Sequence, residues 1–136
     1  MTTVLWLRIS SVIALLFAAG HTLGGLKDWS PIGDNPVLSS MKTVGFQAMG
    51  VNRTYFDFYR GFGYSISVAQ VMLGVLLWQL AALARKDLLA VRPLIAVITL
   101  ASLVGSFIAW RFILPVPAMF SLVLVASLTV AYAVAR

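Results

Sequence analysis

Polar and ionisable side chains are rare in the apolar stretches of this chain, and those present gather near one end of the stretches. His21 lies near the end of the first apolar stretch and Arg111 near the end of the third. Asp57, Arg60, Tyr64 and Ser67 follow one another at spacings of three, four and three residues, so they share one face of a helix. Because polar groups inside an apolar helix are costly, each of these residues is a candidate functional residue.

These side chains suit the binding of a polar headgroup. Two arginines with a histidine favour an anionic or carbonyl group, because guanidinium groups form paired hydrogen bonds with such oxygens. Neighbouring aromatic rings would supply the apolar walls of an outer-side pocket. The predicted ligand-binding residues are His21, Asp57, Tyr59, Arg60, Tyr64 and Arg111.

An enzymatic use of the same residues is the alternative. His21 would act as acid or base and Asp57 would orient it, since a histidine pKa of about 6.5 suits proton transfer near neutral pH. A simpler interpretation also stays open for each residue. Asp57 would cap its helix and pair with Arg60 one turn later. Arg111 would reach the lipid headgroups, and His21 would donate to a backbone carbonyl in a packed interface.

Composition and motifs exclude several kinds of site. The chain has one histidine and no cysteine, which rules out bis-histidine haem ligation, a zinc site and iron–sulfur clusters within one chain. It contains no GxSxG, HExxH or P-loop motif. We therefore expect no metal and no cofactor. The net charge is +6, but the basic residues are scattered singly, so we expect no nucleic-acid partner.

Four stretches of the chain are almost purely apolar, and each is long enough to cross a bilayer. The hydrocarbon core is about 30 Å thick and a helix rises about 1.5 Å per residue, so a span needs about 20 apolar residues. The predicted spans are approximately residues 4–25, 57–84, 94–114 and 117–135. Hydrophobic residues make up 61% of the chain and charged residues 10%, so residues 1–136 are predicted to form a single transmembrane domain.

The predicted fold is all-α. The turns after the second and third spans are short and join antiparallel neighbours, so we expect an integral membrane four-helix antiparallel bundle. Small residues would mark the contact faces of the helices. Gly20 and Gly24 are four residues apart on the first helix. Ala101, Gly105 and Ala109 repeat at the same spacing on the third helix.

The outer loop, about residues 26–53, is the one sizeable segment outside the spans. Asn35 offers an N-cap and Pro36 the first position of a helix. Three apolar residues follow at helical spacing: Val37, Met41 and Val44. We therefore predict a short amphipathic helix on the membrane surface. Thr54, with Asp57 three residues later, is a capping-box pattern and predicts that the second long helix begins near Thr54.

The positive charges favour both termini on the cytoplasmic side of a bacterial inner membrane. The predicted layout divides the ten Lys and Arg residues evenly between the two sides. However, the positive-inside rule gives most weight to short loops near span ends, and Arg85, Lys86 and Arg92 crowd one such loop. The tryptophans fit this layout as anchors in the headgroup region, two inner and two outer: Trp6, Trp78, Trp29 and Trp110.

Two short motifs carry a family resemblance. They are AGHTLGG at residues 19–25 and FYRGFG at residues 58–63. Both resemble paired signatures of a small four-helix family of bacterial membrane proteins. The layout is more distantly similar to that of the DoxX-like proteins, which are associated with quinone-linked oxidases and accessory roles. The resemblance implies the fold and points to His21 and Arg60, and it implies no activity.

Taken together, these features predict a small polytopic membrane protein without a catalytic centre of a known type. We expect it to act as an accessory subunit, or to bind a lipid, a quinone-like molecule or another amphipathic ligand. Its expected partners are membrane lipids, and a larger membrane complex or a homo-oligomer stays open. The enzyme alternative has less support, because the sequence lacks a nucleophile motif, a metal site and a cofactor motif.

Overall fold

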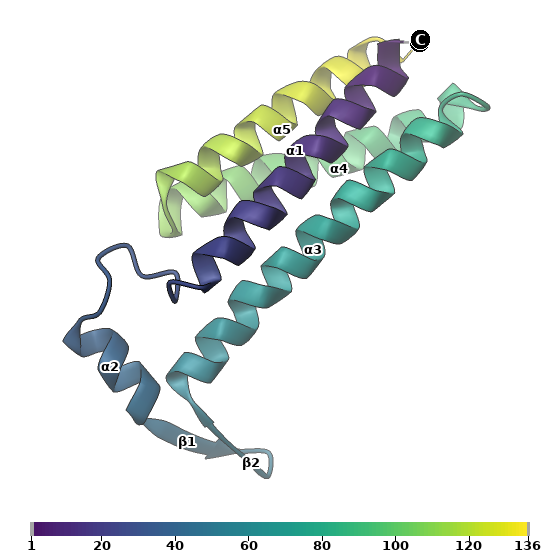
Figure 1. Cartoon of the computed structure of the whole chain (residues 1–136). Helices are drawn as coiled ribbons and strands as arrows, with labels where there is room; N and C mark the ends of the chain where they lie inside the picture. Colours follow the sequence, from purple (N-terminus) through teal and green to yellow (C-terminus); the bar gives the residue numbers. More distant parts are fainter. Residues whose placement is uncertain (1, 136) are drawn as a thin grey trace. The chain divides into compact units, whose positions relative to one another are not determined.

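The computed structural model describes residues 2–135, which form five helices and one two-stranded sheet (Figure 1). The helices are α1 (Thr2–Gly25), α2 (Pro36–Thr43), α3 (Tyr55–Leu83), α4 (Leu88–Phe112) and α5 (Pro115–Ala133). The strands are β1 (Gly45–Ala48) and β2 (Val51–Thr54). Four of the helices, α1, α3, α4 and α5, are long and apolar enough to cross a membrane, as the sequence predicted.

Side chains at their N-termini fix where α2 and α3 begin. The N–H of Leu38 donates to Asn35 Oδ1 at 3.0 Å, and Pro36 takes the first helical position. At the start of α3, the N–H of Thr54 donates to Asp57 Oδ2 at 2.9 Å. The N–H of Asp57 donates in return to Thr54 Oγ1 at 3.0 Å, which completes a capping box. Both predicted helix starts are confirmed.

The fourth helix, α4, begins earlier than the sequence predicted. Its first residue is Leu88 and not residue 94, because the carboxylate of Asp87 accepts a backbone N–H of the first turn at 3.0 Å. Pro93 lies inside α4, where a proline removes one N–H donor without ending the helix. Arg92 therefore belongs to the helix, and two of the three basic residues predicted for the preceding loop remain in it.

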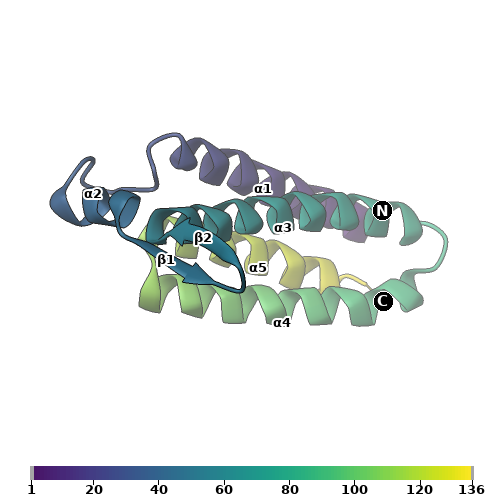
Figure 2. The same cartoon turned by 90° about the horizontal axis from the view of Figure 1, so that it is seen from below.

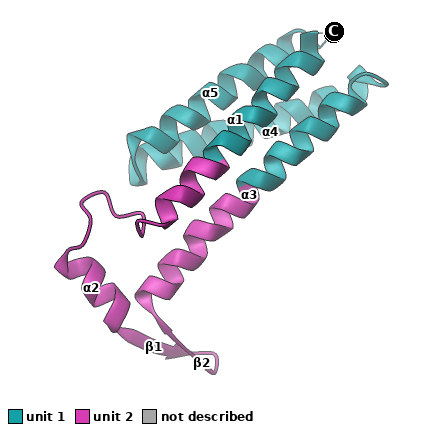
Figure 3. Cartoon of the chain, in the orientation of Figure 1, with its two compact units in different colours: residues 1–17, 70–136 teal, residues 18–69 magenta. Residues whose placement is uncertain are grey.

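The chain divides into two compact units (Figure 3). Among the described residues, the helical unit consists of residues 2–17 and 70–135 and contains all of α4 and α5. The loop unit consists of residues 18–69. It contains the end of α1, the outer loop with α2 and the two strands, and the first half of α3.

Side chains from four helices share the core of the helical unit. The largest fully buried apolar side chains come from α1, α3, α4 and α5 in turn: Leu7, Leu77, Ile95 and Leu128. The helices α4 and α5 lie side by side along their length (Figures 1 and 2). A hydrogen bond of 2.8 Å joins the hydroxyls of Ser10 and Ser127, so a polar contact also connects α1 to α5.

A glycine that the sequence analysis did not select lies at a close approach of α1 and α3. A Cβ on Gly74 would lie 2.7 Å from the Leu15 side chain, and the Gly74 carbonyl accepts the Ser11 hydroxyl at 2.6 Å. By contrast, a Cβ on Gly20 or on Gly105 would meet no atom within 4 Å. The predicted contact faces are wrong at these two positions, because glycine is frequent in apolar helices whether or not another helix lies close.

The loop unit contains an antiparallel hairpin that the sequence analysis did not predict (Figure 2). The strands pair with Ala48 opposite Val51, and Met49 and Gly50 connect them. These two residues have φ angles of 51° and 79°. Positive φ at both central residues is the geometry of a type I′ turn, whose twist matches that of the strands. The predicted all-α fold is therefore correct for the helices and wrong for residues 45–54.

The apolar face predicted for α2 is exposed. Val37 and Val44 are open to the surroundings, and Met41 is half-buried. The buried residue of this helix is Leu38, which was not part of the predicted face. As a result, α2 packs against the loop unit through the side chain of Leu38, and the side chains of Val37 and Val44 stay exposed.

Candidate functional site around Trp29 and Arg60

Trp29 lies at the centre of an aromatic cluster in the loop unit. The centroid of its indole is 5.4 Å from the His21 ring and 5.1 Å from the Tyr64 ring. The ring of Tyr59 meets the indole edge-on at 6.0 Å, and the Tyr59 hydroxyl donates to the Trp29 carbonyl at 3.4 Å. The indole N–H donates to the His21 carbonyl at 2.8 Å. Three predicted ligand-binding residues therefore surround one tryptophan.

Three glycines make room for the indole. A Cβ would lie 2.5 Å from the ring if placed on Gly63, 2.7 Å if on Gly25 and 3.1 Å if on Gly24. Because non-bonded carbon atoms prefer separations of about 3.5–4.0 Å, a side chain at residue 63 or 25 would collide with the ring. We call these three glycines the Trp29 socket. Each of the two sequence motifs therefore contributes at least one glycine that packs against the indole, whereas Gly20 and Gly61 of the same motifs do not.

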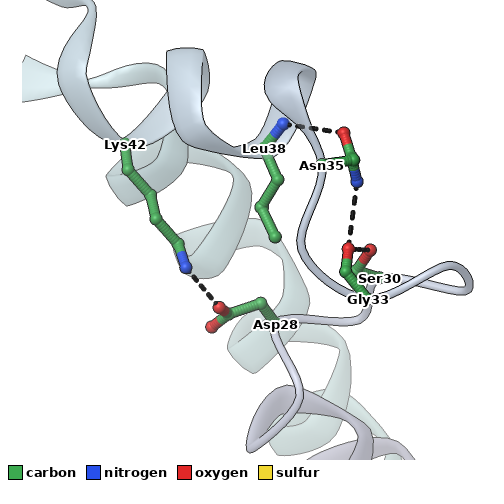
Figure 4. A network of polar contacts seen from close by, with 6 residues as sticks. All are labelled: Asp28, Ser30, Gly33, Asn35, Leu38 and Lys42. Carbon is green, nitrogen blue, oxygen red and sulfur yellow. Dashed lines mark hydrogen bonds and ion pairs between the residues drawn. The ribbon is translucent and has the colours of Figure 1, made fainter.

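The backbone of the outer loop turns back to bring Trp29 to its socket. Asp28 and Trp29 both adopt left-handed backbone conformations, with φ angles of 54° and 48°, which are uncommon for residues other than glycine. The Trp29 N–H donates to the Gly24 carbonyl at 3.0 Å and closes the end of α1. The Asp28 carboxylate forms an ion pair with Lys42 of α2 at 2.7 Å (Figure 4). The indole of Trp29 packs against α1 and α3, and its predicted role as an anchor in the headgroup region stays a prediction.

His21 is hydrogen-bonded within the loop unit. Its Nδ1 atom and the Oγ atom of Ser67 lie 3.0 Å apart, and Ser67 is only 6% exposed. This contact joins the end of α1 to the first half of α3. The simpler interpretation of His21, a histidine hydrogen-bonded in a packed interface, fits this geometry, with a serine hydroxyl in place of the expected backbone carbonyl.

The carboxylate of Asp57 acts at the start of its own helix. It accepts the backbone N–H of Thr54, as the capping interpretation predicted. The predicted ion pair between Asp57 and Arg60 is wrong, because the one ion pair among residues 2–135 joins Lys42 to Asp28. Asp57 is exposed at the edge of a shallow hollow over β1 and β2.

Arg60 is an exposed cation in aromatic surroundings. Its guanidinium carbon lies 5.6 Å from the centroid of the Phe56 ring and 5.7 Å from that of the Tyr64 ring. Tyr59 and Phe62, on either side of it in sequence, are exposed aromatic residues. Cations are attracted to the faces of aromatic rings within about 6 Å. The rings of Phe56 and Tyr64 therefore flank the guanidinium, and the Arg60 side chain stays exposed.

Arg111 belongs to the helical unit. Its guanidinium lies 5.1 Å from the ring centroid of Phe112, in the last turn of α4. Both residues are exposed. The convergence of Arg111 with His21 and Arg60 stays a prediction.

The described part of the chain offers no metal centre: in residues 2–135, no group of three or more His, Cys, Asp or Glu side chains could hold a metal ion. No protein-family model matches the chain, and neither a curated protein nor a solved structure does. The resemblance to a small four-helix family and, more distantly, to the DoxX-like proteins stays an expectation.

The contact between Trp29 and His21 was not predicted, although the glycines of the two motifs indicate that a bulky side chain packs near His21. Glycine at positions 24, 25 and 63 lies in the two motifs, and glycine is the residue that permits close approach of a bulky group. A spacing rule for one helix could not identify the partner, because Trp29 reaches the glycines from a loop.

Proposed function

We propose that this chain is an integral protein of a bacterial inner membrane, with four spans in an antiparallel bundle and both termini in the cytoplasm. The length and composition of α1, α3, α4 and α5 support membrane insertion. Large apolar side chains of α4 are mostly exposed, including Val97 (65%), Leu100 (64%) and Phe107 (58%). Such a surface is unfavourable in contact with water, whereas contact with lipid chains would suit it. Arg85 and Lys86, in the turn before α4, support this orientation.

We also propose that the protein binds an amphipathic ligand, a lipid or a quinone-like molecule, through Arg60 and the rings around it on the outer side. One observation carries this proposal: the exposed Arg60 guanidinium rests on two rings and has no carboxylate within ion-pair distance among residues 2–135. A guanidinium in this setting binds phosphate or carbonyl oxygens in paired geometry. The exposed rings of Tyr59 and Phe62 would contact the apolar part of the ligand.

In this proposal, the Trp29 socket gives the site a rigid base. Tyr64 contacts both the indole of Trp29 and the guanidinium of Arg60. Tyr64 therefore links the packed interior of the loop unit to the exposed cation. His21 supports the same base through Ser67 and through the Trp29 indole, so its role is to position the site.

The same binding surface would let the protein serve as an accessory subunit of a larger membrane complex or as a homo-oligomer. The alternative, an enzyme with His21 and Asp57 as acid and base, has less support. The Asp57 carboxylate is engaged with Thr54 at the helix start, and the His21 ring is hydrogen-bonded to Ser67.

Native mass spectrometry tests the binding proposal. The protein is purified in a mild detergent with equal amounts of phosphatidylglycerol and phosphatidylcholine, and the retained lipids are counted. We expect the wild type to retain phosphatidylglycerol preferentially, because its phosphate carries an uncompensated negative charge. Arg60→Gln should weaken this preference several-fold, since it removes the charged donors that would bind the phosphate oxygens.

Arg53→Gln is the matched control. Arg53 is an exposed arginine of the same unit, and its guanidinium donates to the Asn52 carbonyl at 2.8 Å. This variant removes the same charge and should keep the lipid preference. Equal losses in the two variants, or no preference in the wild type, would contradict the proposal. A protein subunit that co-purifies with the wild type and is lost in Arg60→Gln would identify this surface as the contact of an accessory subunit.

A further inference from the structure

The helical unit contains a cavity of about 290 Å³ that the outer site does not use. Each of the four long helices contributes to its wall, for example through Ile13 of α1, Gln70 of α3, Ser102 of α4 and Ser121 of α5. Its volume is close to the lower end of the range of small-molecule sites, roughly 300–1,000 Å³. Gln70 lies near the middle of α3 and Ser102 near the middle of α4, so the cavity is far from the ends of these helices.

Three half-buried polar side chains lie in this wall. Within residues 2–135, the amide of Gln70 and the hydroxyls of Ser102 and Ser121 form no hydrogen bond with another residue. The buried serines elsewhere in the helical unit behave differently, because each one is hydrogen-bonded: Ser10, Ser11, Ser106 and Ser127. Since a serine in an apolar helix commonly bonds the carbonyl four residues earlier, the lack of such bonds distinguishes Ser102 and Ser121.

All three residues are half-buried, so their polar groups are open to whatever fills or surrounds the cavity. In a membrane these surroundings are apolar, and polar groups without partners are expensive there. An amide or hydroxyl that loses its hydrogen bonds costs several kcal/mol in an alkane-like medium. A bound molecule that supplies the missing hydrogen bonds would recover this cost. The cavity wall therefore favours a ligand with at least one polar group directed toward Gln70, Ser102 and Ser121.

The chemistry of the wall defines the class of ligand. No ionisable side chain lines the cavity, so a charged ligand would be desolvated without a counter-charge. A glutamine amide both donates and accepts hydrogen bonds, and so does a serine hydroxyl, which suits a carbonyl or hydroxyl oxygen. The remaining lining residues are largely apolar and include Phe120 and Leu124. At the roughly 30 Å³ that one water molecule occupies, this volume holds about ten non-hydrogen atoms.

We propose that this cavity binds an uncharged amphiphile of about ten non-hydrogen atoms, whose carbonyl or hydroxyl oxygen is hydrogen-bonded by Gln70, Ser102 and Ser121. The site is separate from the outer cluster around Arg60 and does not depend on the function proposed for that cluster.

Photolabelling of the purified full chain in lipid nanodiscs tests this site. The probe is 1-decanol carrying a diazirine in the middle of its chain, and labelled residues are mapped by mass spectrometry. We expect labelling of the cavity wall on α4 and α5, with Ala101 and Leu124 as examples. An excess of 1-decanol should suppress this labelling, and the same excess of decane, which has no oxygen, should not.

Two variants separate binding in the cavity from general partition into lipid. Gln70→Leu keeps the volume of the side chain and removes its hydrogen bonds, so the competed labelling should fall several-fold and up to about tenfold. Gly105→Leu should abolish it, because Gly105 lines the cavity and a Cβ there meets open space. Gly20→Leu is the matched control, since it is another helical glycine with open space and lies outside the cavity wall.

The outcomes are distinct. Labelling of α4 and α5 that 1-decanol suppresses, that Gly105→Leu removes and that Gly20→Leu preserves would support the site. Labelling that is spread over exposed residues such as Leu100 and Phe107, without competition by 1-decanol, would overturn the proposal and leave the cavity to water. If Gly105→Leu does not fold, which its thermal unfolding reveals, Ser102→Ala with Ser121→Ala takes its place, because both changes only remove a hydroxyl. Unchanged labelling in that double variant and in Gln70→Leu would also overturn the proposal.

Discussion

At the scale of single residues, Trp29 organises the loop unit. The indole of Trp29 can lie directly against the helix backbones because the residues beneath it, Gly24, Gly25 and Gly63, have no Cβ. Glycine inside a helix is unfavourable by about 1 kcal/mol relative to alanine. The contacts of the indole with Gly63, with the His21 carbonyl and with two tyrosine rings offset that cost.

The Trp29 socket makes a prediction for two glycines on the same helix. Gly63→Ala should lower the stability of the protein by about 1–3 kcal/mol, because its Cβ would overlap the indole and force it to move. Gly61→Ala should be neutral or stabilising by up to about 1 kcal/mol, since a Cβ there meets nothing within 4 Å and alanine favours the helix. Thermal unfolding in detergent measures both effects.

A second-site change tests whether Trp29 is the cause. Trp29→Phe alone should be destabilising, because the smaller ring leaves part of the socket empty and loses the N–H bond to His21. Combined with Gly63→Ala, however, the smaller ring should tolerate the added methyl group. The two changes together should therefore cost less than the sum of their separate effects. Simple additivity would mean that Gly63 matters for a reason other than the indole.

The residues of the candidate site differ in how well the sequence could predict their roles. The capping roles of Asn35, Thr54 and Asp57 depend on partners three residues away, and all were predictable from sequence. The contacts of His21 with Ser67 and with Trp29 were not. They depend on the left-handed turn before Trp29 and on pairing between distant segments, and neither has a local signature.

At the scale of elements, the β-hairpin was not predicted because one of its two turn residues is atypical. Type I′ turns favour Asn-Gly or Asp-Gly, because both central residues need positive φ. This chain has Met49 before Gly50, and methionine at a φ of 51° is an unfavourable choice. The strands are four residues each and contain few β-branched side chains, so neither composition nor turn signal indicated a hairpin.

The same reasoning predicts a stabilising change. Met49→Asn should stabilise the hairpin by about 1 kcal/mol, because asparagine tolerates the left-handed conformation and Asn-Gly is the preferred type I′ pair. Met49 is fully exposed, so no packing is lost. Gly50→Ala should have the opposite effect, since alanine is strained at a φ of 79°. Hydrogen exchange of the backbone amides in residues 45–54 reports both changes, and slower exchange in Gly50→Ala would contradict the turn assignment.

The starts of α3 and α4 allow a direct comparison of two caps. Asp57→Ala should lower the stability, because its carboxylate accepts the Thr54 N–H at the start of α3. Asp87→Ala should cost about 0.5–2 kcal/mol, because Asp87 is the N-cap of α4 and its carboxylate accepts a backbone N–H of the first turn. Thr54→Ala should cost a similar amount, since it removes the other half of the capping box. Thermal unfolding measures all three. A large loss in Asp57→Ala with none in Thr54→Ala would show that Asp57 has a role beyond capping.

At the scale of the whole molecule, basic residues mark one end of the helical unit. The guanidinium of Arg8 lies 4.7 Å from the Trp78 ring, and that of Arg92 lies 4.6 Å from the Tyr132 ring. The sole acid of this unit is Asp87, so neither arginine has a nearby carboxylate to neutralise it among the described residues. Anionic lipids, which attract basic residues to the cytoplasmic leaflet, could supply the counter-charges, in agreement with the proposed orientation.

The four long apolar helices and their approximate limits were predictable, because length and apolar composition suffice for that purpose. Their lateral contacts were not. Gly74 and the Ser10–Ser127 pair had no distinguishing pattern, whereas the more visible Gly20 and Gly105 make no close contact. In an apolar chain nearly every helix face looks alike, so a one-dimensional pattern holds little information about which faces meet.

The proposed membrane orientation leads to a prediction that introduced cysteines can test. The chain contains no cysteine, so a single introduced cysteine is the only reactive thiol. Ser40→Cys in α2 and Asp87→Cys before α4 replace exposed residues, and neither change alters the lysines and arginines that set the orientation. In spheroplasts, a membrane-impermeant maleimide should label residue 40 directly and residue 87 only after the membrane is permeabilised. Labelling of both cysteines from the same side would contradict the four-span topology, and labelling of residue 87 alone from outside would reverse the orientation.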